Sequence, residues 1–153
     1  MPPSYLTRQG FQKLQEELEY LRTVKRQEVA NRLHEAMEGG ELIEDAEYEA
    51  AKNEQAFVEG RIQELEMLLA NARVVEESVK SDVIQIASKV TIQESGYEPE
   101  MYIIVGPAEA NPREGRISNE SPLGRALMNH RAGDSVSVDA PDGSFTVRIV
   151  KID

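Results

Sequence analysis

The chain has 153 residues, of which 40% are hydrophobic and 29% charged, so it could form one ordinary domain or two small ones. It has no cysteine, which excludes a disulfide framework, and no apolar run approaches the roughly 20 residues needed to cross a bilayer. The net charge of −11 argues against broad nucleic-acid affinity, because such affinity requires clustered Lys and Arg. We expect a cytoplasmic protein that contacts no membrane and meets RNA or DNA only locally or through another protein.

The first half of the chain predicts a long helix with one apolar stripe. Thr7 suits the N-cap of this helix, and Gly39 and Gly40 provide the positive-φ residues with which helices often end. The stripe recurs at steps of three and four and then with looser spacing: Phe11, Leu14, Leu18, Leu21, Val29, Leu33 and Met37.

A second helix follows with a cleaner stripe. Its members are Ala51, Gln55, Val58, Ile62, Leu65, Leu69 and Ala72. Two helices of about 30 residues each, joined by a short turn, can bury such stripes only against one another. We therefore expect an antiparallel coiled-coil finger, on the order of 45–50 Å long at ~1.5 Å per residue.

Acids are concentrated at the far end of this finger, where residues 39–50 read GGELIEDAEYEA and include no base. Acids in the first turn of the second helix would complement its dipole, which is one explanation of the cluster. The same dipole disfavours Glu35 and Glu38 in the last turn of the first helix. The remaining repulsion suggests a bound cation. Glu41 and Glu44 could face a common point and suit Mg²⁺, whose other ligands would come from outside the chain.

Three stretches of the chain carry a resemblance to a known family: LTRQGFQKLQEELEYL, GGELIEDAEYEAAKNEQAFVEGRIQELEMLLANARV and ISNESPLGRALMNHRAGDSV. In order and spacing they resemble the bacterial Gre transcript-cleavage factors, and the GreA branch more closely than GreB. The resemblance covers essentially the whole chain. Its most specific part is the family pattern G-D-L-x-E-N-A-E-Y, which here reads GELIEDAEY from Gly40 to Tyr48.

The resemblance implies a transcription elongation factor that is not itself an enzyme. In that family the finger enters the secondary channel of RNA polymerase and stimulates cleavage of the RNA 3′ end in backtracked complexes. The two acids matching Glu41 and Glu44 help hold a second catalytic Mg²⁺ in the polymerase active site. By the resemblance, this chain has no cofactor of its own, shares Mg²⁺ with the polymerase, meets the nascent RNA indirectly and acts as a monomer.

Other tip residues take their expected roles from the same resemblance. Lys52 matches a basic position thought to lie near the extruded RNA, and Tyr48 could steer the nucleic acid. From the residues alone, Lys52 could equally pair with its helix neighbours, and Tyr48 could be helix packing. The residues expected to support the tip are Gly40, Asp45 and Glu47.

Two departures from the family pattern leave alternatives open. Glu replaces the usual Asp at position 41, and Asp replaces the usual Asn at position 45. An altered, acid-rich tip is also similar to Gre-like inhibitors, which occupy the same channel without stimulating cleavage. A coiled-coil scaffold that needs no metal is a third class, but its tip would be expected to be apolar or of mixed charge.

Arg22, Lys25 and Arg26 form a small basic patch that either holds RNA along the finger or is a solvated helix face.

After about residue 78 the sequence predicts a small β-rich domain. Ala140 to Ser144, APDGS, is a hairpin turn, and Ser121 with Pro122 begins a short helix that extends to about His130. The expected strands contain Lys89 to Gln93, Met101 to Val105, Val136 with Val138, and Phe145 with Val147 and Ile149.

The predicted fold class is therefore α+β. An antiparallel coiled-coil finger would occupy residues 1–77, with its acidic tip at 39–48, and a small β-rich domain residues 78–153. The resemblance implies that this second domain is FKBP-like and binds the rim of the polymerase channel through Glu120, Ser121 and Pro122. Helix capping explains those three residues almost equally well.

Overall fold

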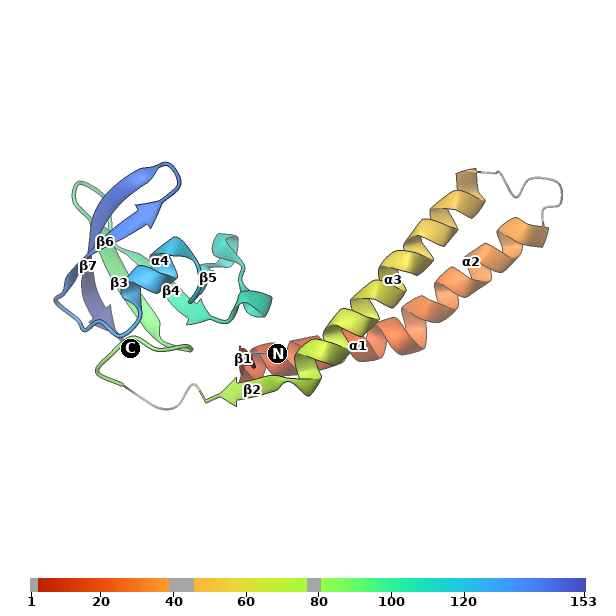
Figure 1. Cartoon of the computed structure of the whole chain (residues 1–153), viewed down its shortest axis with the longest axis horizontal. Helices are drawn as coiled ribbons and strands as arrows, with labels where there is room; N and C mark the ends of the chain where they lie inside the picture. Colours follow the sequence, from red (N-terminus) through yellow and green to blue (C-terminus); the bar gives the residue numbers. More distant parts are fainter. Residues whose placement is uncertain (1–2, 39–45, 77–80) are drawn as a thin grey trace. The chain divides into compact units, whose positions relative to one another are not determined.

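A computed structural model describes residues 3–38, 46–76 and 81–153 (Figure 1). Its contacts divide the chain into two units. One contains Gln12–Asn71, and the other contains the N-terminal residues up to Phe11 together with Ala72–Asp153. The predicted boundary at residue 77 lies outside the described residues. The element order confirms the predicted α+β class, since a long helical region is followed by a curled sheet with one short helix.

The helical region forms the expected antiparallel hairpin, in which α2 and α3 run side by side (Figure 1). Its elements are α1 (Arg8–Tyr20), the π-helix η1 (Leu21–Lys25), α2 (Arg26–Glu38) and α3 (Ala46–Ala70). The buried apolar side chains are Leu14, Leu18, Leu21, Val29, Ala51, Val58, Ile62 and Leu65, all from the two predicted stripes. Met37 differs from the prediction, because the stripe fades at half-buried Leu33 and leaves Met37 52% exposed.

The π-helix η1 explains the loose spacing in the first stripe. Leu21 and Val29 are eight residues apart, one more than two turns of a regular apolar repeat allow. The Arg26 N–H donates to the Leu21 carbonyl, so the π turn absorbs one extra residue. Leu21 and Val29 consequently both lie buried, with 8% and 1% exposed. The Thr23 hydroxyl also donates to the Glu19 carbonyl at 2.8 Å, a contact that often bends helices.

The β-rich unit contains a five-stranded sheet with the order β5-β4-β3-β7-β6. In this sheet β4 and β5 pair in parallel, and the other neighbouring strands pair antiparallel. The predicted hairpin turn is confirmed, with Ala140 opposite Gly143, whose φ of 129° suits glycine. The sequence did not predict β5. The strands are β3 (Lys89–Glu94), β4 (Glu100–Val105), β5 (Arg116–Ser118), β6 (Ser135–Ala140) and β7 (Gly143–Ile152).

One face of this sheet packs with helix α4 (Pro122–Leu127) around a buried apolar core. The prediction that α4 extends to about His130 is wrong. Met128 has a ψ of 137°, outside the helical region, and Asn129 has a φ of 68°. The core contains Ile84, Val90, Ile92, Ile104, Ile117, Leu127, Val136, Val138, Val147 and Ile149.

A second, two-stranded sheet joins the start of the chain to the end of the hairpin sequence. Strand β1 (Ser4–Thr7) pairs in parallel with β2 (Ala72–Val75), from Ser4 opposite Ala72 to Thr7 opposite Val75. Two short 3₁₀ helices, η2 (Pro107–Glu109) and η3 (Pro112–Glu114), lie between β4 and β5 in the chain. None of the helices in the described parts of the chain is long and apolar enough to span a membrane.

Candidate functional site

The acid-rich end of the hairpin is only partly described. Glu41 and Glu44, predicted to bind the metal, lie outside the described residues, as do Gly40 and Asp45. On the α3 side, Glu47 occupies the first helical turn, as predicted, and Glu49 lies in the same turn. On the α2 side, the Glu38 carboxylate lies 3.0 Å from the His34 ring. Between Leu33 and Ala51 the sequence contains no Lys or Arg, so acids dominate both flanks of the tip.

Lys52 and Tyr48, the two residues expected near the RNA, lie together on α3. The Lys52 ammonium is 6.0 Å from the centroid of the Tyr48 ring, which is within the range of a cation–π contact. Tyr48 is half-buried, whereas Lys52 is exposed. A positive charge therefore lies one helical turn beyond Tyr48, the last residue of the tip motif.

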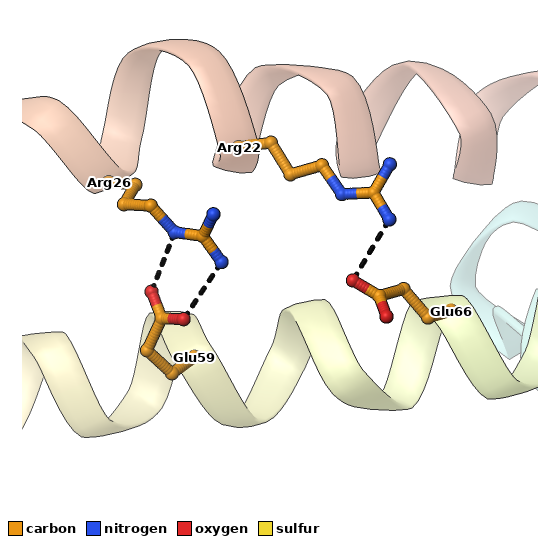
Figure 2. A network of polar contacts seen from close by, with 4 residues as sticks. All are labelled: Arg22, Arg26, Glu59 and Glu66. Atoms are coloured by element: carbon orange, nitrogen blue, oxygen red, sulfur yellow. Dashed lines mark hydrogen bonds and ion pairs between the residues drawn. The ribbon is translucent and has the colours of Figure 1, made fainter.

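The shaft of the hairpin is cross-linked by ion pairs between its two arms (Figure 2). Arg22 reaches Glu66 with an N–O distance of 2.9 Å. Arg26 donates two hydrogen bonds to Glu59, at 2.9 and 2.8 Å, in the two-pronged geometry that arginine and carboxylate favour. The hydrogen bond from Arg26 to Glu59 raises the pKa of Arg26.

Nearer the tip, one carboxylate of α3 binds two bases of the opposite arm. The Lys25 ammonium lies 2.8 Å from Glu54, and Arg32 contacts the other oxygen of the same carboxylate. Hydrogen bonds from Lys25 first and then from Arg32 lower the pKa of Glu54. The hydrogen bond to Glu54 likewise raises the pKa of Lys25.

Of the two alternatives for Arg22, Lys25 and Arg26, these contacts favour a charged helix face over a patch that holds RNA. Each of the three residues pairs with an acid of α3 across the hairpin. Sequence reasoning missed their partners, although acids beside the α3 stripe are the available signal. Ion pairs therefore offset many of the charges along the shaft, whereas the sequence from Leu33 to Ala51 contains several acids and no Lys or Arg.

The segment from Glu120 to Pro122 caps helix α4. The Ser121 hydroxyl accepts from the Gly124 N–H at 3.1 Å and donates to the Ser118 carbonyl at 2.6 Å. This geometry confirms Ser121 as the N-cap, with Pro122 at the first helical position. The Glu120 N–H donates to the Ser118 hydroxyl, which leaves an exposed side chain at 120. Its expected contact with a partner stays a prediction.

Comparisons with known proteins agree with the architecture described above. Residues 4–74 match the family described as "Transcription elongation factor, N-terminal", and residues 79–153 match "Transcription elongation factor, GreA/GreB, C-term". The chain is 49% identical to the transcription elongation factor GreA of Thermoanaerobacter pseudethanolicus, over 98% of this chain and 97% of that protein. It is also 49% identical to GreA of Acetivibrio thermocellus, over 96% and 94% of the two chains.

Solved structures with similar sequences include GreA factor homolog 1 of Thermus thermophilus. It is 39% identical to this chain, with 99% of each chain covered and a TM-score of 0.46.

Proposed function

Since this chain belongs to the GreA/GreB family of transcription elongation factors, we propose that it inserts its helical hairpin into the secondary channel of RNA polymerase. There it would stimulate cleavage of the RNA 3′ end in backtracked complexes. The observation that supports this proposal best is the distribution of charge on the hairpin. Bases of the shaft pair with acids across the two arms, whereas the sequence from Leu33 to Ala51 is rich in acid and has no Lys or Arg.

The shaft suits the delivery of a charged tip over a distance. The pairs Arg22–Glu66 and Arg26–Glu59 tie the two arms together at successive levels (Figure 2). The shared Glu54 carboxylate ties them again nearer the tip. Such pairs add little free energy each, but they restrict sliding of one helix along the other. A fixed register would keep the tip acids in one position relative to the polymerase.

Glu41 and Glu44 are the residues that would meet the catalytic metal. Their carboxylate oxygens are donors that Mg²⁺ prefers, and two carboxylates leave room for water, phosphate and the polymerase's own ligands. Within residues 3–38, 46–76 and 81–153, no cluster of three or more His, Asp or Glu side chains could hold a metal ion. When bound there, Mg²⁺ would supply the second metal of a phosphodiester hydrolysis that the polymerase already performs. The chain would thus donate ligands and would not be the enzyme.

Lys52 would act beside the RNA instead of at the metal. Its ammonium lies over the Tyr48 ring, so the aromatic face holds the cation on the tip side of α3. An exposed ammonium there would attract the phosphates of the extruded RNA. Tyr48 would then orient Lys52 and provide an aromatic surface at the end of the tip motif.

The β-rich unit would provide a separate contact with the polymerase through Glu120, Ser121 and Pro122. Ser121 is occupied in capping α4, so it would shape this segment, and the exposed Glu120 side chain would reach the partner. Replacing Glu120 by Lys should therefore weaken binding without changing cleavage at saturating factor.

A second candidate function is inhibition by occupation of the same channel. The features that favour it are Glu41 in place of the family's Asp and Asp45 in place of its Asn. One extra methylene moves the carboxylate outward, and metal sites can be sensitive to displacements of about 1 Å. An inhibitor would bind the polymerase and block nucleotide entry without shortening RNA.

The test uses backtracked complexes of the cognate polymerase across a series of Mg²⁺ concentrations. The wild-type chain should shorten RNA 3′ ends. The E41A/E44A variant should lose this stimulation but still compete with wild type for the polymerase. The variant E35A/E49A is the matched control, because it removes the same charge from exposed helix positions and should keep cleavage. Blocked nucleotide entry without shortening would favour the inhibitor, and equal cleavage by E41A/E44A would overturn the proposal.

A further inference from the structure

Glu109 is a buried acid whose contacts the proposed function does not use. Its side chain is 4% exposed and lies at the end of η2 in the β-rich unit. One oxygen accepts from the Thr7 N–H at 2.7 Å, and the other accepts from the Thr7 hydroxyl at 2.6 Å. Arg116 also donates to this second oxygen, at 2.9 Å. The carboxylate therefore holds both donors of one residue that lies 102 positions earlier in the chain.

Thr7 is the N-cap of α1, as the sequence predicts. Its hydroxyl accepts from the Gly10 N–H at 3.0 Å, which satisfies a free donor in the first helical turn. In a capping box, an acid three residues after the cap would accept the N–H of the cap residue in return. That position is Gly10 here, and Glu109 accepts the Thr7 N–H instead.

The glycine at position 10 fits this arrangement, in which Glu109 replaces a local acid as the acceptor of the Thr7 N–H. A Cβ on Gly10 would lie 1.9 Å from a Glu109 carboxylate oxygen, which is too close for any side chain without movement of Glu109. Gly106, just before η2, is similarly restricted, because a Cβ there would lie 2.0 Å from the Tyr5 carbonyl oxygen. Two glycines thus allow η2 to approach the first strand and the start of α1 closely.

We propose that Glu109 is a remote capping residue, which makes the first turn of α1 depend on the folded β-rich unit. A local capping box would form with the helix itself. Here the acceptor becomes available only when η2 and β5 have folded and Arg116 holds the carboxylate. Glu109 is therefore a positioning residue for the start of the hairpin, and this role does not rest on the proposed transcript cleavage.

Hydrogen exchange of the full-length chain tests this proposal residue by residue. In E109Q, the amides of Thr7 and Gly10, which are held by this cap, should exchange about five- to tenfold faster, because one cap contact is typically worth that much. The amides of β3 and β7 should keep their protection. The exposed acid Glu114, in the neighbouring η3, provides the matched control, and E114Q should leave exchange unchanged.

A double-mutant cycle separates a capping contact from general destabilisation. T7V removes the hydroxyl. The double variant T7V/E109Q should speed exchange no more than about twofold beyond E109Q alone, because both changes break the same group of hydrogen bonds. G10A is a second, independent variant that should reproduce the E109Q pattern by displacing the carboxylate. Additive effects, faster exchange throughout the sheet, or unchanged exchange in E109Q would each overturn the proposal. Cleavage is not measured in this experiment, so failure of the proposed function would leave its result intact.

Discussion

The β-rich unit and the helical hairpin bury their apolar side chains in different ways. In the β-rich unit, residues from β3, β4, β5, β6, β7 and α4 meet in one core, so each buried side chain has neighbours on several elements. In the hairpin, each buried residue faces essentially one partner helix, and exposed ion pairs flank the stripe. A rod only two helices thick has no interior beyond this seam. Mutations, pH and salt should therefore act differently on the two units.

The largest difference should appear when a buried aliphatic side chain is truncated. Ile104 in the sheet core and Leu65 in the hairpin seam are both fully buried. Ile104→Ala should lower the free energy of unfolding by about 3–4 kcal/mol, because its surroundings cannot collapse into the cavity. Leu65→Ala should cost about 2–3 kcal/mol, because two helices can close part of the gap. Chemical denaturation followed by tyrosine fluorescence and circular dichroism measures both values, and a larger cost for Leu65→Ala would contradict the comparison.

Insertion of one alanine after Thr23 should have the next largest effect and should be confined to the hairpin. Because η1 already absorbs one extra residue, a second extra residue would rotate Val29 by about 100° away from the seam. Exposing Val29 should cost about 2 kcal/mol of unfolding free energy. Far-UV circular dichroism follows the lost helix. Deletion of Thr23 leaves Leu21 and Val29 seven residues apart, as in a regular helical seam, and should cost much less, so equal losses in the two variants would show that the π turn does not set the register.

Acid should weaken the hairpin through Glu54. Its pKa in the folded chain lies below the ordinary 4.5, because Lys25 and then Arg32 hydrogen-bond to the carboxylate. The paired carboxylate therefore stabilises the hairpin above pH 4.5, and this contribution is lost as the pH falls through the lowered pKa. Helix content measured during acid titration should fall less steeply in E54Q than in wild type. E35Q, which changes an exposed acid of α2, should keep the wild-type curve.

The hairpin could be predicted from the sequence more fully than the β-rich unit, because its buried contacts follow a local repeat. The hairpin seam is a local repeat, so its stripes and the Thr7 cap could be predicted from spacing alone. The tip motif was found in the sequence, and the expected meeting of Glu41 and Glu44 at one point stays a prediction, because both lie outside the described residues. Contacts between distant residues carry no local pattern. The pairing of β1 with β2 and the contact between Glu109 and Thr7 therefore became visible only in the fold.

The smallest predicted effect is a change in melting temperature when the Arg61 ion pair is weakened. It tests whether the ion pairs of the hairpin set the orientation of its helices more than they add to its stability. Arg61 donates two hydrogen bonds to Glu17, at 2.8 and 2.9 Å, across the two arms. Lysine keeps the charge but cannot form this two-pronged contact. R61K should therefore lower the hairpin melting temperature by only about 1–2 °C at low salt.

The difference should vanish at about 1 M salt, where the screening length is about 3 Å. Arg113, an exposed arginine of the β-rich unit, provides the control, and R113K should leave the melting temperature unchanged at both salt concentrations. A loss for R61K that persists at high salt would assign Arg61 a packing role in place of an electrostatic one. The Arg61 side chain beside the seam would then stabilise the hairpin by packing, as the buried side chains of the core stabilise the β-rich unit.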